Sequence, residues 1–260
     1  MHCKNNVSPI KKQRKKVWKY FWQAFLCVFT LIQIYIYLRL NVFTSCVIPT
    51  YSMSPTLIEG DYIYVSLEKG DAQNEMKSFE RNDILIFNFP YENQSGEKKA
   101  DKGQLYCKRC VAVPGDTFYI DRQGIYHVKQ MDCIIGNLNG QIEAGRLSVE
   151  YDSLYIPRAG DELSIDLSNF HLYRTSIEYE TKKQMSVFRG KIYLGEQMIQ
   201  LYHFQKNYYY MAGDNVGDSY DSRYWGLLPE ELILGKGCFI WFSKNPETKE
   251  IRWSRIFKSL

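Results

Sequence analysis

The stretch IPTYSMSPTL occupies residues 48–57, and a Gly-Asp pair follows it at residues 60–61. Two further segments come later in the chain: YCKR at residues 106–109, leading to PGD at 114–116, and GDNVGDSYDSRYWG at residues 213–226. Each has an ordinary structural interpretation alone, because Ser-x-x-Pro, Pro-Gly-Asp and clusters of serine and aspartate are common in loops and turns. Their occurrence together, in this order, is what separates this chain from an arbitrary loop-rich protein.

The three segments together resemble the bacterial signal peptidase I family. The resemblance includes Gly60-Asp61 after the first segment, the Lys108-Arg109 pair of the second and the DSRYWG run that ends the third. It extends over most of the chain and fades across residues 125–206. It implies a mostly β fold, namely a coiled β-sheet catalytic domain of the signal-peptidase type with an inserted β-rich cap, preceded by one transmembrane helix.

The activity that the resemblance implies is that of a membrane-bound serine endopeptidase, which removes N-terminal signal peptides from exported preproteins. By the same resemblance, Ser52 is the nucleophile and Lys108 is its general base. The backbone N–H of Ser52 and the hydroxyl of Thr50 look like the oxyanion hole, and Ser219 is similar to the serine that orients the lysine amine.

The loop at residues 213–226 also carries an expected supporting pair. Asp221 and Arg223 look like an ion pair that holds this loop against the sheet. Two positions depart from the family pattern: Val216-Gly217 stands where the family often has Arg-Asp, and Tyr51 stands where it often has glycine. The first departure bears on how the loop is braced and the second on the width of the cleft, and neither touches Ser52 or Lys108.

A serine–lysine pair also makes chemical sense without the family name. A serine hydroxyl is a weak nucleophile until a neighbouring base removes its proton, and the usual base is histidine. The four histidines, at positions 2, 127, 171 and 203, have no recognisable triad setting, and the sequence has no G-x-S-x-G elbow. A Ser–Lys dyad needs no histidine. A strand that places Lys108 near the bulky Tyr106 and Val113 removes water from the amine and favours its neutral form.

The resemblance further implies a substrate pocket beside Ser52. Ile48, Pro49, Leu57 and Tyr106 are expected to line a shallow apolar pocket, with Cys107 facing a neighbouring pocket. An extended substrate that pairs with strand edges drops alternate side chains into such pockets. The expected partners are therefore exported preproteins with small residues one and three positions before the cut.

A calcium-binding loop is the alternative interpretation of residues 214–221. Val216 occupies a position that needs an oxygen ligand, so the sequence predicts neither a metal nor another cofactor.

The composition favours strands over helices. The chain has 21 tyrosines and 14 phenylalanines, and aromatic residues suit half-buried pleated surfaces. We expect no long amphipathic helix after the membrane segment. The expected strands are Tyr62–Ser66, Asp83–Phe89, Gln104–Val113, Phe118–Ile120, a hairpin turning at Asp121–Gly124, Tyr208–Met211 and Gly237–Ser243.

These features divide the chain into five parts. The predicted parts are a basic tail (1–16), a transmembrane anchor (17–39), the first part of the catalytic domain (40–124), an inserted tyrosine-rich cap (125–206) and the second part of the catalytic domain (207–260).

Residues 18–38 read WKYFWQAFLCVFTLIQIYIYL and predict a membrane-spanning helix. At 1.5 Å per residue, about 21 residues span the ~30 Å hydrocarbon core of a bilayer. Aromatic residues at both ends match interfacial belts. A cleaved signal peptide is the alternative, but its apolar region is shorter and ends at a small-residue site, whereas TSCVIPTYSM follows here.

The charge distribution predicts the orientation of this anchor. Eight of the 33 basic residues lie in the first forty positions, whereas the first acidic residue is Glu59. By the positive-inside rule the tail stays in the cytoplasm and the catalytic part lies outside, which suggests the bacterial inner membrane and contact with its lipid bilayer. The remainder carries 25 basic against 29 acidic residues, so it has no electrostatic reason to bind nucleic acid.

The seven cysteines do not form the dense, even pattern of a disulfide scaffold. Cys107 and Cys110 have CxxC spacing, but on a strand positions three apart face opposite sides, which disfavours a bridge between them.

Two other functions remain open at the level of sequence. One is a self-cleaving Ser–Lys peptidase related to the repressor peptidases, although a membrane segment stands where their DNA-binding module would be. The other is a membrane-anchored binding protein with a decayed active site, against which the intact Ser52, Lys108 and Ser219 argue.

Overall fold

The computed structural model describes residues 9–41, 43–67, 79–89, 105–120, 126–128, 133–134 and 153–260. The chain divides into two compact units, Met1–Thr44 and Ser45–Leu260. Each unit is described by itself.

The first unit consists of one long helix, α1 (Pro9–Asn41), of 33 residues. Its stretch Trp18–Tyr37 has a mean hydropathy of 1.4, with none of these side chains buried in protein, so the helix is long and apolar enough to cross a membrane. The predicted anchor is thus helical, and the helix also includes the part of the basic tail from Pro9 onward. Proline at the first helical position and the lysines and arginine that follow are compatible with helix, which explains this extension.

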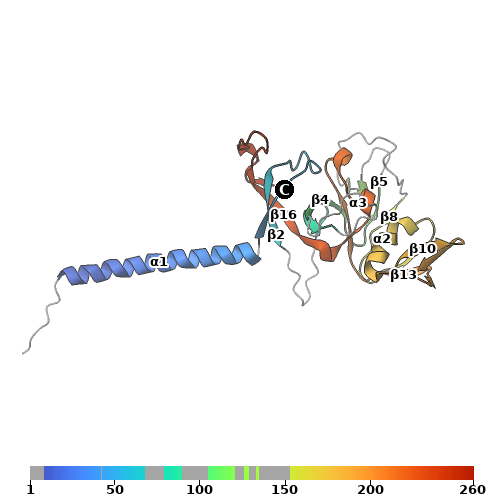
Figure 1. Ribbon diagram of the computed structural model, residues 1–260, viewed down its shortest axis with the longest axis horizontal. Coiled ribbons are helices and arrows are strands. Elements are labelled where there is room, and N and C mark those ends of the chain that lie inside the picture. The colour runs from blue at the N-terminus through green and yellow to red at the C-terminus, as the bar shows by residue number, and fades with distance from the viewer. Residues whose placement is uncertain are drawn as a thin grey trace, which may run out of the picture. The chain divides into compact units, whose positions relative to one another are not determined.

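The second unit is built on an antiparallel sheet, which confirms the mostly β prediction (Figure 1). Its strands run in the order β1-β2-β16-β3-β4-β14-β15, with β17 pairing with β16. The bounds are β1 (Phe43–Val47), β2 (Asp61–Leu67), β3 (Ile84–Asn88), β4 (Leu105–Ala112), β14 (Tyr208–Ala212), β15 (Leu228–Pro229), β16 (Ile233–Ser243) and β17 (Lys258–Ser259). The strands that we expected early and late in the chain therefore do meet in one sheet.

Strand β16 begins at Ile233, four residues before its predicted start at Gly237. Within this added stretch, Gly235 allows close approach of the neighbouring strand β2. A Cβ on Gly235 would lie 2.1 Å from the backbone oxygen of Ser66 on β2. The pairing of β16 shifts register between Ile233 and Gly235 and again between Gly237 and Phe239, so both glycines flank bulges inside one long strand.

The region after β4 contains three smaller sheets. One has the order β7-β6-β5-β8, one pairs β13 with β9, and one has the order β10-β11-β12. The predicted hairpin is present because β5 pairs with β6, while its turn at 121–124 lies outside the described residues. The bounds are β5 (Thr117–Ile120), β6 (Tyr126–Val128), β7 (Cys133–Ile134), β8 (Leu154–Tyr155), β9 (Glu162–Ser164), β10 (Met185–Phe188), β11 (Lys191–Leu194), β12 (Gln197–Met198) and β13 (Leu201–His203).

Helix α2 (Phe170–Thr181), 12 residues long, lies in the same region and is not among the expected elements. Its buried residues Tyr173, Ser176 and Ile177 have the spacing of one helical face, but only one is aliphatic, so the apolar periodicity is weak. Figure 1 shows α2 grouped with β10 and β13, away from β2 and β16. The region is β-rich as expected, and α2 is an additional short helix among its strands.

Three buried clusters stabilise the described part of the second unit. One joins α2 and the small strands to β14 through residues such as Ile177, Phe204 and Tyr210. The other two involve β3 and β4, one around Phe87 and Trp225 and the other around Met53 and Leu57. The insertion thus shares a core with the late strands, and its predicted boundaries at 125 and 206 stay a prediction. The remaining helical elements are α3 (Ser222–Trp225) and 3₁₀ turns at Val216–Asp218, Glu230–Leu232 and Trp253–Arg255.

Candidate active site

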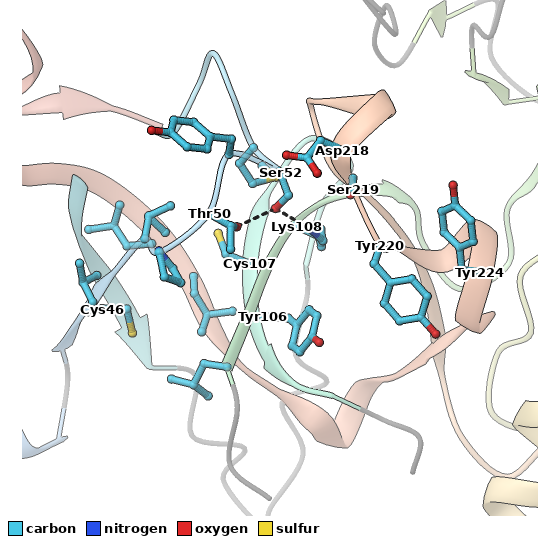
Figure 2. Close-up of a pocket in the computed structure, with 18 of the residues that line it drawn as sticks. Cys46, Thr50, Ser52, Tyr106, Cys107, Lys108, Asp218, Ser219, Tyr220 and Tyr224 are labelled. Carbon is cyan, nitrogen blue, oxygen red and sulfur yellow. Dashed lines mark hydrogen bonds between the residues drawn. The ribbon is translucent and has the colours of Figure 1, made fainter. Parts of the chain in front are cut away.

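Ser52 and Lys108 meet although 55 residues separate them in the chain. Ser52 lies in the loop between β1 and β2, and Lys108 lies in β4. Lys108 Nζ donates a hydrogen bond to Ser52 Oγ over 2.6 Å (Figure 2). The hydroxyl oxygen of Thr50 lies 3.3 Å from Ser52 Oγ, so the three predicted side chains gather at one point.

Burial sets the protonation chemistry of Lys108. Lys108 is only 3% exposed to solvent. Loss of water from the amine lowers its pKa, and the nearby Arg223 acts in the same direction, while the carboxylate of Asp221 opposes both. A lysine with a lowered pKa provides neutral amine at a lower pH than an exposed lysine does, which is the state that a general base needs.

The loop after β14 holds a fully buried carboxylate, Asp221. Its Oδ2 accepts hydrogen bonds from the hydroxyl of Ser219 at 2.8 Å and from the backbone N–H of Gly213 at 2.9 Å. Arg223 pairs with the same carboxylate through Nε and Nη2, each at 2.7 Å. The predicted Asp221–Arg223 ion pair is therefore present in the structure, and it fixes Ser219 beside the site.

Asn215 ties this loop to the loop of Ser52. Its backbone N–H donates to the carbonyl oxygen of Ser52 at 3.0 Å, and its Nδ2 donates to the carbonyl oxygen of Tyr51 at 3.2 Å. Val216, one of the two departures from the family pattern, is buried in a hydrophobic cluster, and its carbonyl accepts from Arg223 Nη2 at 3.1 Å. The loop at residues 213–226 is therefore held in place by hydrogen bonds to backbone carbonyls from Asn215 and Arg223.

A second ion pair, missed by the sequence analysis, joins β4 to the same loop. Arg109 Nε and Nη2 donate to the two carboxylate oxygens of Asp214 at 2.7 and 2.6 Å. Arg109 also donates to the carbonyl of Asn82 at 2.8 Å. Arg109 follows Lys108 and Asp214 is the second residue of the third segment, so both lie in the segments quoted above, but neither segment indicates that the two side chains meet.

Ser52 and Lys108 open onto a cavity of about 770 Å³. Four of the predicted pocket residues line it: Ile48, Pro49, Tyr106 and Cys107. Leu57 does not, because it is fully buried in the cluster behind the cavity. Further lining residues, which were not expected, are Cys46, Val47, Met53, Ile63, Ile86, Leu105, Gly217, Asp218, Tyr220 and Tyr224.

Tyr51, the other departure, also lines the cavity and is 50% exposed. Its ring therefore occupies space that a glycine would leave open.

Cys107 and Cys110 are both free thiols. Cys107 lines the cavity, whereas Cys110 is fully buried in a different cluster with Phe87 and Leu228. The prediction that they face opposite sides of the strand is confirmed. Burial raises the pKa of the Cys107 thiol to about 12, so it stays protonated at neutral pH and is a poor competitor for Ser52 as nucleophile.

Comparison with known proteins agrees with this arrangement. The model of the family described as signal peptidase, peptidase S26, matches residues 21–242. The chain is 28% identical to "Signal peptidase I" of Buchnera aphidicola subsp. Schizaphis graminum, over 90% of this chain and 78% of that protein. It is 29% identical to the protein of the same name from Pseudomonas fluorescens, over 78% and 65%, and 26% identical to the one from Aquifex aeolicus, over 83% and 82%. With the matched region reaching from the apolar helix to β16, the chain belongs to the signal peptidase family, peptidase S26.

Proposed function

We propose that this protein is a membrane-anchored serine endopeptidase that removes N-terminal signal peptides from exported preproteins. The observation that carries the proposal is the 2.6 Å contact between a buried lysine amine and a serine hydroxyl at an apolar cavity, in a member of this family. A self-cleaving regulator lacks support from the matched relatives, whose shared name is signal peptidase I.

In the proposed mechanism, the neutral amine of Lys108 removes the proton of Ser52 as Oγ attacks the scissile carbonyl carbon. The resulting oxyanion accepts hydrogen bonds from the Ser52 backbone N–H and the Thr50 hydroxyl, whose oxygen already lies 3.3 Å from Ser52 Oγ. Lys108 then gives the proton to the leaving amine. A water molecule, deprotonated by the same lysine, hydrolyses the acyl-enzyme and releases the signal peptide.

Ser219 positions the lysine amine in this proposal. Its hydroxyl hydrogen is directed to Asp221, so its oxygen lone pairs are available to the neighbouring amine. Asp221 and Arg223 act through Ser219 and support the site without touching the substrate.

The substrate lies as an extended strand across the cavity between the edges that carry Ile48 and Cys107. Alternate side chains enter the apolar pockets on that side, where Tyr51 and Met53 limit the space. We therefore propose that small residues are preferred at positions −1 and −3, counted back from the cut.

The proposed location is the inner membrane of a bacterium, with α1 embedded in the lipid bilayer. The lysine-rich stretch before Val17 stays in the cytoplasm, and the sheet that carries Ser52 lies outside.

The decisive experiment incubates the purified protein in detergent with a synthetic precursor and maps the cut by mass spectrometry. We expect a single cut after a small residue. The matched control is Ser52→Ala, which removes only the attacking oxygen and should lower turnover by about 10³-fold or more. Activity of Ser52→Ala within tenfold of the parent protein would remove Ser52 from its role.

A further inference from the structure

A row of four rings, here called the aromatic wall, borders the cavity: Tyr106, Phe89, Tyr220 and Tyr224. Ring centroids lie 5.0 Å apart for Tyr106 and Phe89, 6.0 Å for Phe89 and Tyr220, and 5.5 Å for Tyr220 and Tyr224. The three tyrosines line the same cavity as Ser52, and Phe89 contacts two of them. The mechanism proposed above uses neither Tyr220 nor Tyr224.

Contacts with Trp225 hold part of the aromatic wall in place, but two of its rings are still exposed to solvent. Trp225, which is only 4% exposed, packs against Phe89 at 6.0 Å, and its Nε1 donates to the carbonyl oxygen of Tyr220 at 3.4 Å. Tyr220 and Tyr224 nevertheless each remain 48% exposed. Rings that served only to fill a core would be buried, whereas these hold apolar area in contact with water at the cavity.

The position of the aromatic wall relative to the small-residue pockets indicates which substrate residue contacts it. Figure 2 shows Tyr220 and Tyr224 on the opposite side of Ser52 from Cys46, with the ring of Tyr106 between them, so Tyr106 borders both the pockets and the wall. Side chains of an extended peptide alternate between two sides. If residues −1 and −3 face the pockets near Cys46 and Cys107, residue −2 faces the wall.

We infer that the aromatic wall is a further substrate subsite that binds a large apolar or aromatic side chain at position −2, with Tyr220 as its specificity-determining residue. The inference rests on the proposed function and extends it from small to large side chains. Offset or edge contacts between rings supply the attraction. Asp218, which also lines the cavity, disfavours an acidic residue at the same position by like-charge repulsion.

The test uses synthetic precursors with alanine at −1 and −3 and either alanine, phenylalanine or aspartate at −2. For the parent protein, kcat/KM with phenylalanine should exceed kcat/KM with alanine about 3–10-fold, the range that an aromatic pair provides. Tyr220→Ala should bring this ratio close to one, and Tyr220→Phe should keep it. Phe188→Ala, which changes an exposed ring on β10 that does not line this cavity, is the control and should leave the ratio unchanged.

Three outcomes overturn the inference while leaving the proposed function intact. The first is a parent enzyme that cleaves the alanine and phenylalanine peptides equally well. The second is Tyr220→Ala lowering kcat/KM for both peptides by the same factor, which indicates a structural role only. The third is a changed preference at the residue after the cut in place of −2. Failure of the parent enzyme to cleave any of the peptides contradicts the proposed function itself, and the inference falls with it.

Discussion

Lys108 differs from an ordinary lysine in one respect, its separation from water, and this predicts a pH dependence. Burial lowers the pKa of its amine, so the fraction of neutral base increases as pH rises through that lowered value. Activity should therefore rise with pH along one ionisation below the ~10.4 of a free lysine. The measurement is kcat/KM against pH. A profile that is flat from about pH 6 to 10 would mean that another group removes the serine proton.

Lys108→Arg is the matching substitution. A guanidinium stays protonated at any usable pH and cannot accept the proton of Ser52, so we expect no measurable turnover. Substantial activity of this variant would end the assignment of Lys108 as base.

The same burial predicts that Lys108→Met is inactive but more stable than the parent protein. The folded parent binds fewer protons at this amine than the unfolded chain does, because its folded-state pKa is the lower one. Its stability therefore rises with pH toward about 10.4, the unfolded value. Removing the amine should raise stability by about 1–2 kcal/mol at neutral pH, with a gain that shrinks as pH rises. Thermal unfolding of both proteins at neutral and alkaline pH measures this, and an equal gain at both pH values contradicts it.

Individual site residues show which parts of the site could be predicted from the sequence. Ser52, Thr50 and Lys108 sit in recognisable segments, and the structure brings them together. The Arg109–Asp214 pair escaped notice because nothing local indicates that two residues 105 positions apart meet. Leu57 is apolar and near Ser52 in the sequence, which favours a place in the pocket. Only the three-dimensional path of the loop shows that its side chain packs behind the cavity wall and does not line the cavity.

At the scale of elements, the approach of two loops depends on Gly213. A Cβ there would lie 2.2 Å from Ser219 Oγ and 2.5 Å from the carbonyl oxygen of Ser52, so one of the loops must shift. Gly213→Ala should lower kcat/KM by about 10²-fold, the usual cost of misplacing a catalytic group by an ångström.

The control for this prediction is Gly217→Ala, where an added Cβ meets nothing within 4 Å. Circular dichroism should show both variants folded. Equal activity of the two variants would contradict the idea that close packing of these loops sets the geometry of Ser52.

Elements with strong local signals were predictable and elements that depend on tertiary contacts were not. Strands β2, β3 and β4 have runs of apolar and aromatic residues and lie within about a residue of their expected bounds. Helix α2 has one aliphatic residue on its buried face and is stabilised by packing against the cluster of Phe204 and Tyr210. The start of β16 could not be predicted because Gly235 has a low intrinsic preference for strands, and its role in the strand depends on its close approach to Ser66.

For the whole molecule, the charge asymmetry around α1 predicts its orientation. Protease added outside intact cells should spare the stretch before Val17, and after the outer face is exposed it should cut the part that follows Ser45. Terminal tags read by immunoblotting identify the protected end. Cutting of the tail in intact spheroplasts, with the sheet protected, would reverse the proposed orientation.

The central place of β16 has a consequence for how the enzyme is made. Without β16 the main sheet falls into two parts, β1-β2 and β3-β4-β14-β15, because among the described strands only β16 joins β2 to β3. Ser52 follows the first strand of one part, and Lys108 lies in the other. Until residues 233–243 arrive, an emerging chain therefore holds its nucleophile and its base on two parts of the sheet that are not yet joined by strand pairing. Pairing between strands far apart in the sequence is a late and slow folding step. Peptidase activity therefore first appears when synthesis of the sheet is nearly finished.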